Sequence, residues 1–83
     1  MIEVKIINKI EDKVNEYQER TGATKTWIAK QMNISKQNLY TIMKSQNPTI
    51  ETILMCSALF ECDISELYDY DIIKDDEIEV HKN

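Results

Sequence analysis

Side chains that can hydrogen-bond to nucleic-acid bases and phosphates are concentrated in the middle of the chain. Residues 36–44 hold two lysines, two amides, a tyrosine and a threonine without one carboxylate: Lys36, Gln37, Asn38, Tyr40, Thr41 and Lys44. Lysine can donate to guanine acceptors, glutamine can pair with adenine through two hydrogen bonds, and a threonine methyl group can pack on thymine. This set indicates a polar surface suited to an anionic, base-bearing polymer.

The charge distribution supports the same chemistry, although the whole chain is acidic, with a formal net charge of −5. Residues 20–50 hold no acid and five cations: Arg20, Lys25, Lys30, Lys36 and Lys44. Residues 51–83 hold two lysines and ten acids. An acid-free stretch of 31 residues in a chain that is 30% charged indicates an anionic partner. The alternative is chance together with ordinary surface lysines.

The sequence offers no arrangement for catalysis, a cofactor or a metal. It has one histidine, His81, and two cysteines, Cys56 and Cys62, which are not in a C-x-x-C spacing; a zinc site needs about four such ligands. The cysteines are interpreted as small core residues. There is no nucleophile–base pair and no glycine-rich phosphate loop, so we predict that the protein is not an enzyme and binds no cofactor.

No membrane segment or signal peptide is expected, and the predicted location is cytoplasmic. The longest apolar runs are three or four residues, and charges interrupt the first residues, Met1–Lys5.

The composition predicts a single all-α domain. A chain of 83 residues with one Gly and one Pro lacks the turn residues of a β-sandwich or barrel. Apolar residues spaced three and four apart, such as Ile10, Val14 and Tyr17, predict helices. Five helices are expected, at residues 8–20, 24–32, 36–44, 47–60 and 63–70. The alternation of Ile2, Val4 and Ile6 with charged residues predicts a short additional strand, unless the first helix begins earlier.

Capping residues mark where these helices begin. Side chains suited to N-caps precede the five helices: Asn8, Thr24, Ser35, Asn47 and Asp63. Asn8 and Asp63 are each followed three residues later by glutamate, as in a capping box. Pro48 suits the first position of a helix, and Gly22 can take the left-handed conformation that ends one.

The second and third predicted helices meet the requirements of a helix-turn-helix motif. A small residue, Ala29, follows Ile28 where the helices must cross. Asn33 tolerates the positive φ of the turn, and Ile34 then enters the core. Leu39 and Ile42 are expected to be the buried anchors of the third helix.

With these residues, from about Ile7 to Leu67, the chain resembles the lambda-repressor-like helix-turn-helix family of the XRE/Cro type. The resemblance continues through Pro48–Leu54 and Ile64–Leu67 and covers about 60 residues. Three positions depart from the family pattern. Lys25 stands for a usual Gln, Met43 for a Glu that pairs with an Arg of the first helix, and Glu61 for a frequent Gly.

The resemblance implies a five-helix domain that binds double-stranded DNA, with the third helix in the major groove. It implies base contacts from Lys36, Gln37 and Thr41, with Ser35 and Tyr40 adjacent to them as further base contacts. The alternative for Tyr40 is simple packing within the protein. The resemblance implies phosphate contacts from Thr24, Lys25 and Lys44. It also implies a small transcriptional regulator, a repressor of phage or mobile-element type. Trp27 is expected in the core rather than as a stacking platform for bases.

Members of this family usually bind DNA as dimers, so a homodimer is expected. Met55 and Ala58 on the fourth helix are candidate contacts, as are strands at Ile2–Val4 and Ile78–Val80. Residues 1–70 are predicted to be the DNA-binding domain and residues 71–83 an acidic tail. The alternative function is that of an antitoxin or other interaction protein whose tail holds a partner protein; the tail could also simply be solvated.

Overall fold

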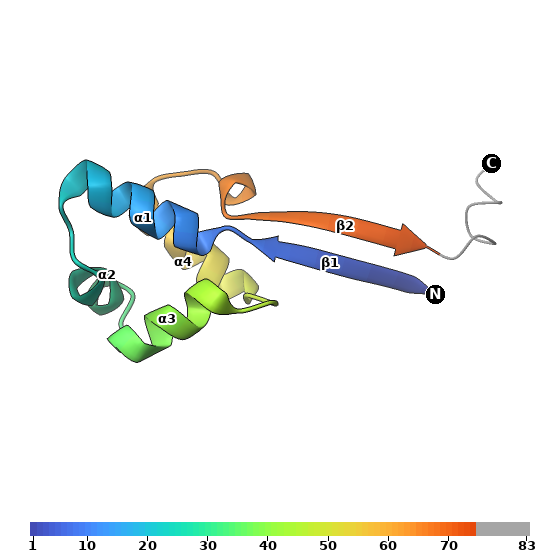
Figure 1. The fold of residues 1–83 in the computed structure, drawn as a ribbon, viewed down its shortest axis with the longest axis horizontal. Coiled ribbons are helices and arrows are strands. Elements are labelled where there is room, and N and C mark those ends of the chain that lie inside the picture. The colour runs from blue at the N-terminus through green and yellow to red at the C-terminus, as the bar shows by residue number, and fades with distance from the viewer. Residues whose placement is uncertain (75–83) are drawn as a thin grey trace.

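The computed structural model describes residues 1–74. In chain order they form strand β1 (Ile2–Asn8), helices α1 (Ile10–Thr21), α2 (Lys25–Gln31), α3 (Lys36–Lys44) and α4 (Ile50–Phe60), the 3₁₀ helix η1 (Ile64–Glu66) and strand β2 (Tyr68–Lys74). Figure 1 shows the helices gathered at one end, with the two strands projecting from them as a ribbon. The fold is mostly helical but not all-α, because these strands form an antiparallel sheet.

The fifth helix predicted at residues 63–70 is present only as the short 3₁₀ helix η1, and its predicted extent to residue 70 is wrong. Only the turn of η1 is helical, and the chain enters β2 directly after Leu67. From Tyr68 onward, tyrosines and isoleucines alternate with aspartates, and aromatic and β-branched residues favour strands. Strand β1 then supplies the backbone hydrogen-bond partners that a strand requires.

The strand predicted at the N-terminus is present, but it pairs with residues 68–74. The segment Ile78–Val80, considered as its partner, lies outside the described residues. The boundary predicted between residues 70 and 71 falls inside β2. The ribbon is therefore continuous with the helical part of the molecule at both of its strands.

Side-chain caps begin most of the helices. Thr24 Oγ1 accepts a hydrogen bond from Trp27 N, and Asp63 forms the predicted capping box with Glu66. Helix α4 differs from expectation because Thr49 caps it, and so the helix begins at Ile50, two residues after Pro48. Thr49 Oγ1 accepts a hydrogen bond from Thr52 N at 3.1 Å, and threonine is among the residues that favour the N-cap position.

The core lies between the four helices and is closed by the residue that precedes β2. Its buried side chains come from every helix: Ile10, Val14, Ile28, Ala29, Met32, Leu39, Met43, Ile53, Cys56, Phe60 and Leu67. Cys56 is one of them, and burial raises the pKa of its thiol to about 11, so it is uncharged at neutral pH. Both cysteines are free thiols. None of the helices in residues 1–74 is long and apolar enough to cross a membrane.

Helix α4 ends at a strained residue, and this yields a stability prediction. Glu61 has φ 55° and ψ 49°, the left-handed conformation, which costs a side-chain-bearing residue about 1–2 kcal/mol relative to glycine. We expect Glu61→Gly to raise the free energy of unfolding by about 1 kcal/mol, measured by urea denaturation. The matched variant is Glu19→Gly, at a helical position near the end of α1. It should instead lower the free energy of unfolding by about 1 kcal/mol. A loss of stability in both variants would contradict this explanation.

An ion pair joins α1 to η1. Lys13 Nζ lies 2.6 Å from Glu66 Oε1 and 2.9 Å from Glu16 Oε1. The hydrogen bond from Lys13 lowers the pKa of Glu66, helped by the backbone of Asp63. Because the folded-state pKa lies below the unfolded value of about 4.3, the stabilisation is complete above that value. It is lost as the pH falls through the folded-state pKa.

We therefore expect Glu66→Gln to flatten the acid side of the stability curve. The wild-type protein should lose more free energy of unfolding between about pH 5 and pH 3 than the variant does. Urea denaturation at a series of pH values measures this difference. Lys13→Met removes the cause of the shift and should flatten the same region. Curves that fall in parallel for all three proteins would refute the assignment.

Candidate nucleic-acid interface

The turn between α2 and α3 is organised around one carbonyl group. Ala29 O accepts hydrogen bonds from Met32 N at 3.1 Å and from Ile34 N at 3.0 Å. Asn33, between these two residues, has φ 59°, a conformation that asparagine tolerates better than most residues. Ala29 and Ile28 are buried, and Ile34 packs against the core. The small side chain of Ala29 therefore lets α3 cross close to α2.

Helix α3 presents a polar face to solvent. At about 100° per residue, Gln37, Tyr40, Thr41 and Lys44 fall within one arc on the side opposite buried Leu39, and all four are exposed. Lys36 adjoins this arc in the first turn and is exposed as well. The helix contains no carboxylate. A rod of about 10–12 Å diameter with such a face fits the major groove, which is about 12 Å wide.

The side chains on this face differ in what they already bind. Ser35 Oγ accepts a hydrogen bond from Asn38 N and so caps the helix. Thr41 Oγ1 donates to Gln37 O at 3.2 Å, which leaves the methyl group of Thr41 as the part available to a ligand. Among residues 1–74, the side chains of Lys36 and Gln37 make no hydrogen bond or ion pair. These two are ready to bind without first breaking an internal contact.

The candidate phosphate-binding groups flank α3 and are engaged within the chain. Lys44 Nζ lies 2.8 Å from Glu11 Oε1, and Lys25 Nζ donates to Gln18 Oε1 at 2.8 Å. Thr24 caps α2. The exposed pair of Lys44 and Glu11 is worth about 1 kcal/mol or less. A phosphate can therefore replace Glu11 at small cost.

A single asparagine ties α3 to the base of the ribbon, a role that its sequence context did not suggest. Asn8 Nδ2 donates to Ile42 O at 2.9 Å and to Ser45 O at 2.8 Å, which are carbonyls at the end of α3. Asn8 Oδ1 accepts from Ile10 N at 2.8 Å. The predicted capping box with Glu11 is not formed, since Lys9 occupies the cap position. Asn8 instead holds the start of α1 and the end of α3 together.

The buried side of α3 is anchored by Leu39 and Met43. Ile42, expected as the second anchor, is half-buried and packs at the margin of the core. Met43 stands four residues after Leu39, which places both side chains on the same side of the helix. The spacing of four residues between Leu39 and Met43 is the sequence signal for this pair of anchors.

The expectation that Trp27 lies in the core is wrong. Its side chain is 42% exposed and stacks on Tyr17, with ring centroids 6.4 Å apart and planes at 14°. Tyr17 in turn contacts Phe60, with ring centroids 5.0 Å apart. Arg20 lies over the ring of Tyr17, 5.3 Å from its centroid. Trp27 thus caps the edge of the core near the start of α2.

Two further predicted features involve α4 and the acidic tail. Met55, considered as a dimer contact, packs against the core, and Ala58 is exposed. The large exposed apolar side chains of α4 are Ile50 and Leu54. The tail beyond Lys74 lies outside the described residues. Within residues 1–74, no group of three histidine, cysteine or carboxylate side chains could hold a metal ion.

Comparison with protein families places this geometry in context. Residues 13–72 match the Cro/C1-type HTH DNA-binding domain. The match begins in α1, includes α2, α3 and α4 in full, and ends in β2. No curated protein and no solved structure matches the chain.

Proposed function

This chain belongs to the family of Cro/C1-type helix-turn-helix DNA-binding domains, and from that membership we propose how it binds DNA. Helix α3 enters the major groove and reads base edges through Lys36, Gln37, Tyr40 and Thr41, with Ser35 at its start. The observation that carries this proposal is the exposed face of α3, which is polar, free of carboxylates and rigidly supported by α2.

The chemistry of each side chain supports a distinct contact. Gln37 can pair with adenine through two hydrogen bonds, Lys36 can donate to guanine, and the methyl group of Thr41 can pack on thymine. Thr24, Lys25 and Lys44 bind phosphates on either side and set the position of α3 without reading sequence. In this scheme Lys44 exchanges Glu11 for a phosphate on binding.

The protein acts as a transcriptional regulator that binds as a homodimer. Two copies of α3 would occupy half-sites about one DNA turn apart, and the operator would then be palindromic. We propose that the protein represses transcription. The described residues form a DNA-binding unit, and such a unit can block a promoter by occupying it. The acidic charge of the remaining surface keeps non-specific binding to DNA weak.

The test is selection from a randomised double-stranded DNA library. The best sequence is then titrated against scrambled DNA at two salt concentrations. We expect a palindrome preferred by about a thousandfold, with a logarithmic salt slope of roughly −4 if Lys25 and Lys44 of both copies contact phosphates. Trp27 is the single tryptophan of the chain and provides a fluorescence signal without a label. Absence of any enriched sequence would overturn the proposal.

A further inference from the structure

The two faces of the β1–β2 ribbon differ sharply in chemistry. Directly opposite residues of an antiparallel pair lie on the same face, and the register places Lys74 at the outer end of one face and Asn8 and Tyr68 at its base. Between these ends the face holds Ile2, Val4, Ile6, Tyr70 and Ile72. We call these five residues the apolar ribbon face. The other face holds Glu3, Lys5, Ile7, Asp69, Asp71 and Ile73. Every carboxylate of the two strands therefore lies on the opposite face.

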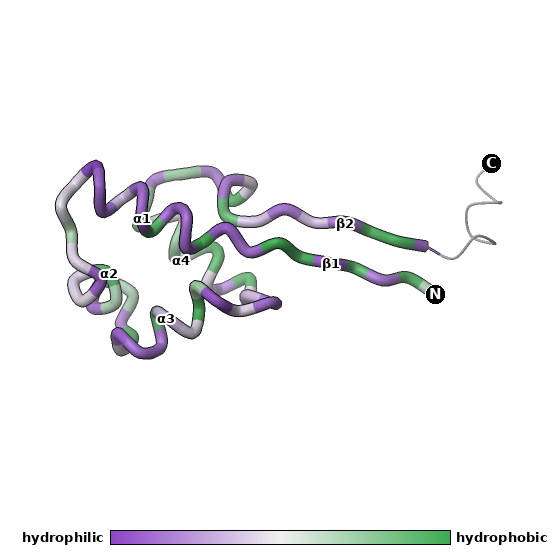
Figure 2. The backbone as a smooth tube through the Cα atoms, viewed as in Figure 1, coloured by the Kyte–Doolittle hydropathy of each residue, from purple (hydrophilic) through white to green (hydrophobic). Residues whose placement is uncertain are grey.

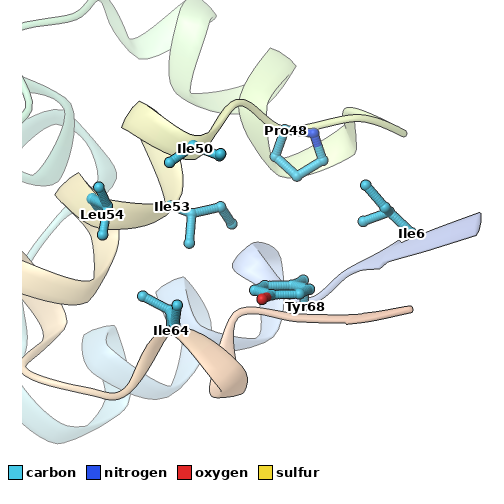
Figure 3. A pocket seen from close by; sticks show the side chains of 7 residues that line it. All are labelled: Ile6, Pro48, Ile50, Ile53, Leu54, Ile64 and Tyr68. Carbon is cyan, nitrogen blue, oxygen red and sulfur yellow. The ribbon is translucent and has the colours of Figure 1, made fainter. Parts of the chain in front are cut away.

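The apolar ribbon face continues into a groove on the helical part of the molecule. Ile6 and Tyr68 form one side of this groove, and the rest is formed by Pro48, Ile50, Ile53, Leu54 and Ile64 (Figure 3). The groove has a volume of about 290 Å³. Ile50 is 78% exposed and Leu54 is 53% exposed. Two leucine-sized side chains of α4 thus face solvent beside a sheet surface that is also apolar.

Such a surface is too large and too exposed for an isolated chain. The exposed parts of its isoleucine, valine, leucine and tyrosine side chains amount to several hundred Å², the size at which an apolar patch marks an interaction site. Figure 2 shows apolar residues recurring along β1 and gathered towards the outer end of β2. The radius of gyration is 15.9 Å, against about 12 Å for a chain of this length that is fully packed. A lone two-stranded ribbon is marginally stable in water, so this one requires a cover.

We infer that the cover is a second copy of this chain, packed through the apolar ribbon face and the adjoining groove. The inference specifies the surface of the dimer proposed above, and it rests on that proposal for its biological meaning. Two chains of net charge −5 repel each other, and this face lets them meet with no carboxylate between them. Its one charged group is Lys74, opposite Ile2 at the outer end of the ribbon, and it holds none of the acids that would attract a basic partner.

A two-fold arrangement makes the surface complementary to itself. The outer end of one ribbon, with Val4 and Ile72, fits the partner's groove beside Leu54, and the reverse contact forms at the same time. Each ribbon is then covered along its exposed length. A standard interface buries roughly 800 Å² per partner, and the contact therefore uses the apolar ribbon face and the groove together. Asn8 joins the base of the ribbon to the end of α3, so the same contact sets the spacing of the two α3 helices.

Neighbouring residues of one strand provide a matched test. Ile72 and Ile73 are 54% and 48% exposed, but they lie on opposite faces of the ribbon. We expect the wild-type protein to sediment as a dimer at tens of micromolar without DNA. Ile72→Lys should raise the dimer dissociation constant at least about tenfold. Ile73→Lys, which places a cation opposite Glu3, should leave it within about twofold. Leu54→Lys, on α4, should act like Ile72→Lys without touching the ribbon.

Circular dichroism on each variant establishes that the helices remain folded. A monomeric wild-type protein, equal effects of Ile72→Lys and Ile73→Lys, or intact dimers in Ile72→Lys and Leu54→Lys would each overturn the inference. Separate titration of selected DNA distinguishes the two proposals. If the protein is a monomer that binds one half-site specifically, the proposed interface is wrong but the proposed DNA recognition stands. If it is a dimer that binds DNA without sequence preference, the proposed interface stands but the proposed DNA recognition is wrong.

Discussion

Replacing Gln37 by alanine is expected to weaken binding to the selected operator by about 1–3 kcal/mol per half-site, roughly 5- to 150-fold. The amide of Gln37 lies near the centre of the exposed arc of α3 and has no side-chain partner among the described residues. Its loss would remove the two base hydrogen bonds proposed for it, and no contact within the protein would be gained. Lys36→Ala should weaken binding by a similar amount. Fluorescence titration with fixed salt measures both.

The adjacent amide serves as the control for this prediction. Asn38 is exposed on the same helix turn, but it lies about 60° beyond the arc of Gln37, Tyr40, Thr41 and Lys44, at the edge opposite to Lys36. Its backbone N–H, and not its side chain, completes the cap with Ser35, so Asn38→Ala leaves the helix start intact. We expect a change in affinity of less than about threefold. Equal affinity of wild type, Gln37→Ala and Lys36→Ala for the best site would reject the base contacts.

Truncating Leu39 should have the largest effect on folding. Leu39 is fully buried between α2 and the remaining helices, so Leu39→Ala removes apolar contacts and leaves a cavity, at a cost of about 2–5 kcal/mol. A chain of this size has a total stability on the order of 5–10 kcal/mol. The variant should therefore unfold at a much lower urea concentration. Its DNA binding should fall in proportion to the folded fraction.

The neighbours of Leu39 decide which residue is the second anchor of α3. Met43 is buried and Ile42 is half-buried. Met43→Ala should therefore lower the free energy of unfolding by about 2–5 kcal/mol. Ile42→Ala should lose about half as much or less, because part of its side chain remains in water in the folded state. The reverse order in urea denaturation would show that Ile42 carries the packing of α3.

Several features of this protein could be predicted from local sequence. Helices α2 and α3 and their caps follow from Thr24 and Ser35, whose oxygens accept amide hydrogen bonds three residues ahead. The positive φ of Asn33 and of Gly22 follows from residue type. The acid-free polar face of α3 is visible as composition alone. Each of these features depends on residues within one or two helical turns, where spacing and side-chain chemistry suffice.

Features that depend on partners far along the chain were decided by the tertiary structure. Residues 68–74 contain both helix and strand signals, and pairing with β1, at least 60 positions earlier, selects the strand. Asn8 carries a helix-capping pattern, yet it binds carbonyls at the end of α3, 34 and 37 residues away. The choice of Met43 over Ile42 as an anchor depends on the direction from which the other helices approach.

The difference between the features predictable from sequence and those decided by the tertiary structure has one physical cause. Backbone conformation and capping are set by interactions between near neighbours, and residue types record them directly. Burial, strand pairing and the continuity of the apolar ribbon face with its groove require segments from opposite ends of the chain to meet. Their free energy belongs to the assembled fold and not to any one segment. The sequence by itself determined where the polar face of α3 lies, and only the tertiary structure placed that face beside a projecting ribbon.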